Sequence, residues 1–266
     1  MEAEEIFQVA WEEEKWELER VLGCLPKLLE SSEWVRVHWI PHTSTCLVWR
    51  GHRTFLQEFS NPNFLQKFSS VCRSFSSSHI LDFLYWVSRY FPSIVKRIHK
   101  IWSWAFWAPS SGVADSSVAF TLNCRGAQRV AEWGIPLEEA SNALRAIRDA
   151  SNSQWALHAP LEIRSSAPDP SMLSPATGRA TVWMGVIVYR PWEYDVPNWE
   201  SAFAMVEKAL EPWEPRPHWA KWTALSPSER SKRFPQWETF ASLRKELDPE
   251  GRFVNPFLGR YFPGTF

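Results

Sequence analysis

The sequence predicts an α+β fold with a mainly antiparallel sheet flanked by helices. Strand-like and helix-like segments follow one another without the regular strand–helix–strand alternation that is typical of a parallel sheet. The 266 residues are 45% hydrophobic and 22% charged, which indicates a folded domain rather than a disordered chain. Internal repeats and a glycine-rich phosphate loop are absent from the sequence, and only 10 glycines occur in it.

The chain begins with a predicted helix and a predicted β-hairpin. Apolar residues suggest one helix over residues 2–30, which Pro26 splits or kinks. Residues 34–40 alternate between apolar and polar, and residues 46–50 form a second β-prone run. The residues between them, 41–45, fit the loop of a hairpin. Two loops are expected further on, at residues 61–63 and 75–78.

The most apolar region is expected to form a helical hairpin over residues 79–107. Pro92 divides it into predicted helices at about 79–90 and 93–107. Charged residues interrupt the region, so it lacks the ~18–20 uncharged residues that a membrane span needs. They are Asp82, Arg89, Lys96, Arg97 and Lys100. Two interpretations stay open: a hairpin packed on the domain, or a surface that touches a membrane, because aromatic side chains lie beside a basic face.

The second half of the sequence mixes strands and helices. We expect a loop at 109–115, strands at 118–125, 156–165 and 181–189, a proline-rich loop at 167–175, helices at 136–150, 199–210, 227–234 and 236–247, and a loop-like tail from Asp248. We assign residues 1–215 to one domain and residues 216–266 to a C-terminal segment.

Composition excludes several classes of function. A net charge of -1 and a pI of about 6.7 argue against nucleic acid as a partner. The four cysteines form no Cys-x-x-Cys pair and are expected to be reduced, and the seven histidines have no metal-ligand spacing. No Gly-x-Ser-x-Gly motif supports a hydrolase. The acidic and aromatic N-terminus resembles neither a secretory signal nor a mitochondrial presequence.

Three residues carry candidate chemistry. Glu162 and Arg164 lie two apart in a predicted strand, so both side chains point to one face. Such a pair can hold several hydroxyls of a polyol, although charged residues at this spacing usually form a solvated strand face. Lys221 follows an aromatic run, where its ammonium could stabilise negative charge or simply lie at the surface. Asn255, after Pro249 and Gly251, has the character of a turn or capping residue.

A series of short motifs resembles L-gulonolactone and D-arabinono-1,4-lactone oxidases, in the order found in that family. The motifs are Trp39-Ile40-Pro41-His42-Thr43, Val48-Trp49-Arg50-Gly51, Trp133-Gly134-Ile135-Pro136, Leu161-Glu162-Ile163-Arg164, Leu173-Ser174-Pro175, Tyr189-Arg190-Pro191, Arg216-Pro217-His218-Trp219-Ala220-Lys221 and Leu247-Asp248-Pro249-Glu250-Gly251-Arg252-Phe253-Val254-Asn255. This sequence departs from the family pattern at Trp222-Thr223, where relatives often have a small residue and a histidine.

The resemblance implies the cap, or substrate, domain of a vanillyl-alcohol-oxidase-type flavoprotein, without its flavin domain. In that family FAD oxidises a sugar lactone and oxygen becomes hydrogen peroxide, in biosynthesis of the ascorbate or erythroascorbate type. Carried over, Glu162 and Arg164 would bind the lactone, Lys221 would assist beside the flavin, and His218 and Trp219 would shape the same wall. Asn255 would belong to a closing motif that packs back on the flavin domain and contacts the cofactor.

The resemblance also implies partners and a location. A separate flavin domain is expected to complete the enzyme, and relatives are associated with membranes of the mitochondrion or endoplasmic reticulum. Two other functions remain as alternatives: a non-enzymatic, cap-like interaction module and a membrane-surface protein.

Overall fold

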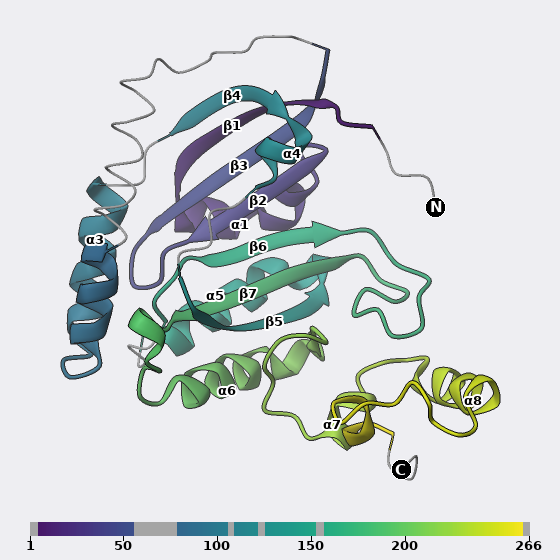
Figure 1. The fold of residues 1–266 in the computed structure, drawn as a ribbon. Helices are drawn as coiled ribbons and strands as arrows, with labels where there is room; N and C mark the ends of the chain where they lie inside the picture. The colour runs from purple at the N-terminus through teal and green to yellow at the C-terminus, as the bar shows by residue number, and fades with distance from the viewer. Residues whose placement is uncertain (1–4, 56–78, 106–108, 122–125, 153–156, 263–266) are drawn as a thin grey trace.

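One antiparallel sheet organises the chain. The computed structural model describes residues 5–55, 79–105, 109–121, 126–152 and 157–262. Within these ranges the strands pair antiparallel in the order β4-β1-β3-β2-β6-β7-β5-β8 (Figure 1). They are β1 (Gln8–Glu17), β2 (Trp34–Trp39), β3 (Thr45–Thr54), β4 (Ser110–Asp115), β5 (Gln128–Pro136), β6 (Leu161–Ser166), β7 (Thr181–Tyr189) and β8 (Arg216–Pro217). The predicted α+β class with a mainly antiparallel sheet is therefore confirmed.

Three helices cover one face of the sheet. They are α1 (Leu18–Leu29), α5 (Ala140–Ser151) and α6 (Trp199–Leu210), with α5 packed between the other two. In Figure 1, α1 and α5 lie behind the strands and α6 lies below β5. Their apolar residues join those of β2, β3, β5, β6 and β7 in one buried cluster. None of these three helices lies on the opposite face of the central strands β2, β6 and β7, which is called the uncovered face below.

Side-chain alternation gives the central strands their two faces. In β2 the residues Val35, Val37 and Trp39 are buried, and the residues between them are only partly buried. In β6 the buried residues are Leu161 and Ile163. Since successive side chains of a strand point to opposite faces, the intervening polar residues lie on the uncovered face.

The N-terminal prediction was wrong. Residues 8–17 form β1 instead of the first turns of a helix, and the helix is confined to α1, which includes Pro26. β1 pairs along its whole length with β3 and also pairs with β4. Backbone pairing with strands distant in the sequence therefore overrides the local preference of a glutamate-rich segment.

Several other boundaries differ from the predictions. The predicted loop at 109–115 is wrong because β4 adds an edge strand there, and the predicted strand at 118–125 is wrong at its start, where the short helix α4 (Ser116–Ala119) lies. β5 was not predicted, and β6 begins at residue 161 rather than 156. The predicted loops at 61–63 and 75–78, and residues 122–125 and 156, fall outside the described residues.

The remaining predicted helices are present, with shifted ends. They correspond to helical residues 79–88, α3 (Ile94–Ala105), η1 (Leu137–Glu139) with α5, α6, α7 (Pro227–Ser231) and α8 (Trp237–Leu247). Short 3-10 turns also occur at η2 (Pro191–Glu193), η3 (Glu211–Trp213) and η4 (Leu258–Arg260). In the described part of the chain, none of these helices is long and apolar enough to cross a membrane.

Candidate functional site

Glu162 and Arg164 lie together on the uncovered face of β6. Because Leu161 and Ile163 point into the core, the two charged side chains point the other way. Arg164 Nε lies 3.5 Å from a carboxylate oxygen of Glu162. The Arg164 side chain keeps 49% of its surface exposed and that of Glu162 keeps 19%, so a ligand above the sheet could reach both.

Strand register aligns further side chains with this pair in two rows. One row runs across β2, β6, β7 and β5 through His38, Glu162, Gly185 and Glu132. The next runs through Arg36, Arg164, Trp183 and Gly134. Directly opposed residues of antiparallel strands share a face, so the rows form one polar and aromatic surface.

A second carboxylate holds Arg164 from the other side. Arg164 Nη2 donates a hydrogen bond of 3.0 Å to Glu132 Oε1, and the Glu132 side chain is only 9% exposed. The guanidinium therefore lies between two carboxylates, and such charge-assisted contacts are stronger than neutral hydrogen bonds.

The basic groups of β2 complete the electrostatics of this surface. Burial lowers the pKa of Arg36, while the nearby charges of Glu162 and Glu13 oppose that change. Burial, followed by the charges of Arg36 and Arg164, lowers the pKa of His38 to about 3, so this imidazole is neutral near pH 7. His38 therefore adds no positive charge to this surface near pH 7.

His218 and Lys221 approach the same surface from the sheet edge. The His218 amide donates to the Glu132 carbonyl (2.9 Å), and the Lys221 amide donates to the His218 carbonyl (3.2 Å) in a turn after β8. Burial is the main cause that lowers the pKa of His218; the Glu132 charge opposes this, and the charges of Lys221, Arg230 and Arg164 add to it. The structure thus brings His218 and Lys221 to the Glu132 end of the site.

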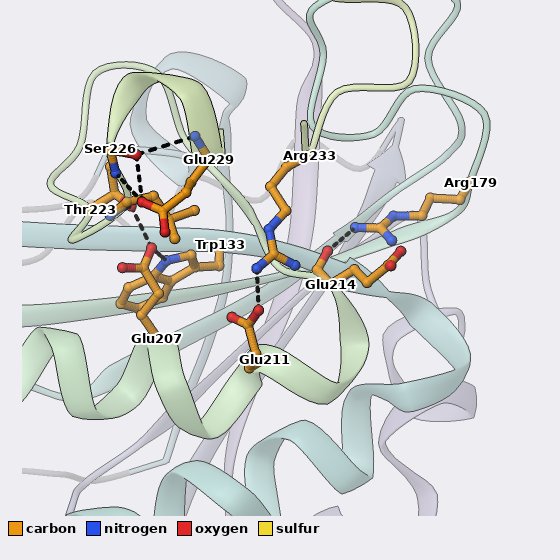
Figure 2. A network of polar contacts seen from close by, with 10 residues as sticks. Trp133, Arg179, Glu207, Glu211, Glu214, Thr223, Ser226, Glu229 and Arg233 are labelled. Atoms are coloured by element: carbon orange, nitrogen blue, oxygen red, sulfur yellow. Dashed lines mark hydrogen bonds and ion pairs between the residues drawn. The ribbon is translucent and has the colours of Figure 1, made fainter. Parts of the chain in front are cut away.

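A buried carboxylate fixes the chain just after Lys221. Glu207 of α6 accepts hydrogen bonds from the Trp133 indole (2.7 Å) and the Thr223 hydroxyl (2.5 Å) (Figure 2). It also accepts one from the Ala224 amide (2.7 Å). In addition, the Trp222 amide donates to the Val130 carbonyl of β5 (3.0 Å). The Lys221 turn is therefore held on both sides by the sheet and by α6.

Trp219 and Asn255 lie in other surroundings. The Trp219 indole donates to the Leu173 carbonyl (2.7 Å), and its ring stacks on Phe234 and Trp237 of the C-terminal segment. The Asn255 side chain accepts from the amides of Phe257 and Leu258 (3.0 and 2.9 Å), which is the behaviour of a turn cap. The structure does not bring either side chain to the Glu162–Arg164 pair.

Five residues of this surface were not found from the sequence: Arg36, His38, Glu132, Trp183 and Gly185. Glu132 carried one signal, a carboxylate within the apolar run Val130-Ala131-Glu132-Trp133. The pairing of β5 with β7 is what places this carboxylate beside the Glu162–Arg164 pair, and β5 itself was not predicted. Among the described residues, histidine, cysteine and acidic side chains form no group that could hold a metal ion.

Comparisons with known proteins identify the family. The family profile described as D-arabinono-1,4-lactone oxidase matches residues 1–261. The chain is 32% identical to the L-gulonolactone oxidase of Scyliorhinus torazame and 31% identical to that of Bos taurus, over 92% of this chain and 55% of each relative. It is 27% identical to an L-gulono-1,4-lactone dehydrogenase of Mycobacterium tuberculosis, over 96% of this chain and 58% of that relative. The chain therefore spans little more than half the length of these curated relatives.

Solved structures with the same fold are more distant in sequence. A solvent-stable cholesterol oxidase matches with a TM-score of 0.65 at 13% identity, over 97% of this chain and 60% of that chain. A glucooligosaccharide oxidase of Acremonium strictum matches with a TM-score of 0.51 at 13% identity, over 92% and 53% of the two chains. At such identities the likeness supports the fold alone, whereas the family profile and the sequence relatives decide the membership: the chain belongs to the D-arabinono-1,4-lactone oxidase family.

Proposed function

We propose that this chain forms the substrate-binding wall of an FAD-dependent aldonolactone oxidase. The observation that carries the proposal is the Glu132–Arg164–Glu162 cluster on the uncovered face of the sheet. A sugar lactone presents hydroxyl donors and a carbonyl acceptor at close spacing. Two carboxylates around one guanidinium offer complementary acceptors and donors, in a surface that is partly screened from water.

The proposed roles follow from the chemistry of each side chain. Glu162 would accept hydrogen bonds from lactone hydroxyls, and the exposed edge of Arg164 would donate to the lactone oxygens. Lys221 would place a positive charge at the edge of the site, where it can stabilise developing negative charge, and His218 would line that edge. For Trp219 and Asn255 the contacts favour a structural contribution, through the C-terminal aromatic cluster and a turn cap.

The family is FAD-dependent, and the donor set at the Lys221 edge fits a flavin ring. An ammonium and a neighbouring imidazole suit the electron-rich edge of a reduced flavin. When bound, FAD would supply the acceptor for the hydride that leaves the lactone carbon, with oxygen as the final oxidant. Because the chain spans 55% of its L-gulonolactone oxidase relatives, we place most FAD contacts in a separate flavin domain, a partner of these residues. In the same proposal, residues 216–266 carry the surface that faces this domain.

Complementation would test the proposal. The chain would be mixed with the part of the Scyliorhinus torazame relative that it does not cover, together with FAD and L-gulono-1,4-lactone. We expect a flavin absorbance that bleaches when lactone is added, with weaker bleaching for Glu162→Gln than for the control Glu246→Gln on the exposed face of α8. If neither the mixture nor the chain alone binds lactone, the proposed function is wrong.

A second candidate function is contact with a membrane surface, which the helical hairpin favours. Apolar residues are exposed on it: Ile80, Phe83, Tyr90, Phe91, Ile101 and Trp104. Arg97 and Lys100 are exposed on the same hairpin, and basic side chains beside aromatic ones favour the surface of an anionic bilayer. Co-sedimentation with anionic liposomes should decrease at high salt and for Trp104→Ser. Equal sedimentation of the variant would favour a protein partner instead, as expected for a non-enzymatic interaction module.

A further inference from the structure

The ion pair between Arg164 and Glu132 crosses an entire strand. Arg164 is on β6 and Glu132 is on β5, and β7 lies between these two strands. Neighbouring strands are about 4.8 Å apart, so the two backbones are separated by roughly 10 Å. The contact of 3.0 Å between Arg164 Nη2 and Glu132 Oε1 is therefore made above the surface of β7.

Gly185 is the residue of β7 beneath this bridge. It pairs with Glu162 on one side and with Glu132 on the other. A Cβ atom added to Gly185 would lie 4.0 Å from Glu132 Oε1 and 3.6 Å from the Glu162 carbonyl oxygen. A Cβ alone would make only ordinary van der Waals contacts with these atoms, so the lack of any longer side chain at Gly185 is what leaves the Glu132 carboxylate its place above β7.

The two ends of the bridge differ in burial. Glu132 keeps only 9% of its side chain exposed, whereas Arg164 keeps 49%. The carboxylate is thus a fixed anchor, and the outer edge of the guanidinium faces the space above the sheet. An arginine without such an anchor would sample many rotamers, and a ligand would have to restrict them on binding.

We propose that Glu132 is a positioning residue that holds the Arg164 guanidinium in the orientation that receives the lactone, and that Gly185 leaves room for this bridge. The part that concerns the lactone rests on the proposed function. The part that concerns Arg164 is a property of the free chain and can be tested without flavin or substrate.

The first experiment measures the order of the Arg164 side chain. The Nε–H signals of the full chain labelled with 15N-arginine would be recorded by NMR, with Arg164 assigned through Arg164→Lys. We expect solvent exchange of the Arg164 Nε–H to accelerate about tenfold in Glu132→Ala, because one charge-assisted contact is lost. Glu132→Gln retains an acceptor oxygen and should recover part of the effect.

Gly185→Val provides a test that leaves Glu132 in place. A Cβ alone makes ordinary contacts at this position, so Gly185→Ala should leave the Arg164 signal close to that of the original chain. The added methyl groups of valine would occupy the space above β7 and separate the two charges, while valine itself favours a strand. Glu33→Gln serves as the matched control, since the Glu33–Arg53 ion pair (2.8 Å) lies elsewhere on the sheet.

The second experiment measures lactone affinity by titration of the same variants with L-gulono-1,4-lactone. We expect Glu132→Ala and Gly185→Val to weaken binding about tenfold and Glu33→Gln to leave it unchanged. Faster Arg164 exchange in these variants, with no lactone binding by the original chain either alone or mixed with the flavin part of the relative, would retain the positioning role and reject the proposed function. Unchanged Arg164 exchange in both Glu132→Ala and Gly185→Val would overturn the inference.

Discussion

Replacing Glu207 with alanine should destabilise the chain strongly, because this carboxylate joins three parts of the fold. It lies on α6 with 3% of its surface exposed and accepts from the Trp133 indole and the Thr223 hydroxyl (Figure 2). It also accepts from the Ala224 amide. Trp133 belongs to the core strand β5, whereas Thr223 and Ala224 follow the Lys221 turn. Removing the carboxylate therefore leaves donors from two separate segments without their acceptor.

The expected loss of unfolding free energy is about 3–6 kcal/mol, built from the separate contacts. Trp133 is fully buried, so leaving its indole N–H without an acceptor lowers the unfolding free energy by about 1–3 kcal/mol. The two donors of the Lys221 segment are nearer to solvent and can turn to water, which limits their combined cost to about 1–2 kcal/mol. The small cavity left by the side-chain methylenes adds about 1 kcal/mol. Glu207→Gln, which keeps one acceptor oxygen, should lose about 2 kcal/mol.

Urea unfolding followed by far-UV circular dichroism measures this difference directly. Glu200→Ala is the matched control, because Glu200 lies on the same helix and is exposed to solvent. Its replacement should change stability by about 1 kcal/mol or less. The reasoning is refuted if Glu207→Ala loses less than about 1 kcal/mol, or no more than the control loses.

Three further predictions concern the site, one helix cap and pH. In an enzyme reconstituted with a flavin domain, Glu162→Gln and Arg164→Ala should each lower kcat/KM by about 100-fold or more, because a positioned charged contact is lost; near-normal kinetics would remove both residues from the site. Ser226→Ala should cost about 1 kcal/mol in urea unfolding, because Ser226 and Glu229 form a capping box at the start of α7, and an unchanged midpoint would contradict this. His38 has a pKa of about 3 in the folded chain and about 6.5 when unfolded, so the unfolded state binds the proton first and stability should fall as pH drops from about 6.5 toward 3. His38→Gln should flatten that part of the stability–pH curve, and an unaltered slope would argue against a neutral, desolvated imidazole.

Local patterns predicted the parts of the fold whose faces are set within one segment. The alternation of residues 34–40 identified β2, and the spacing of Glu162 and Arg164 placed both on one face of β6. The segment 8–17 was mispredicted because its strand conformation depends on pairing with β3 and β4, whose partner residues lie 28–46 and 97–107 positions away in the chain. The role of Glu132 could not be predicted for the same reason, because only the register of β5 against β7 aligns it with Glu162.

The placement of Glu132 and Gly185 fits the proposed ligand-binding role of this part of the sheet better than it fits a contribution to stability. A buried carboxylate paired with a half-exposed arginine adds little net stability, because its desolvation offsets much of the attraction. Glycine inside a strand is also locally unfavourable. Glu132 and Gly185 occupy paired positions of the neighbouring strands β5 and β7, and Gly185 also pairs with Glu162. The helix-covered face of the same strands, with Ile163 and Met184 fully buried, follows the ordinary rules of a hydrophobic core. Local violations of those rules that cluster on one face are expected where binding, and not folding, determines the residues.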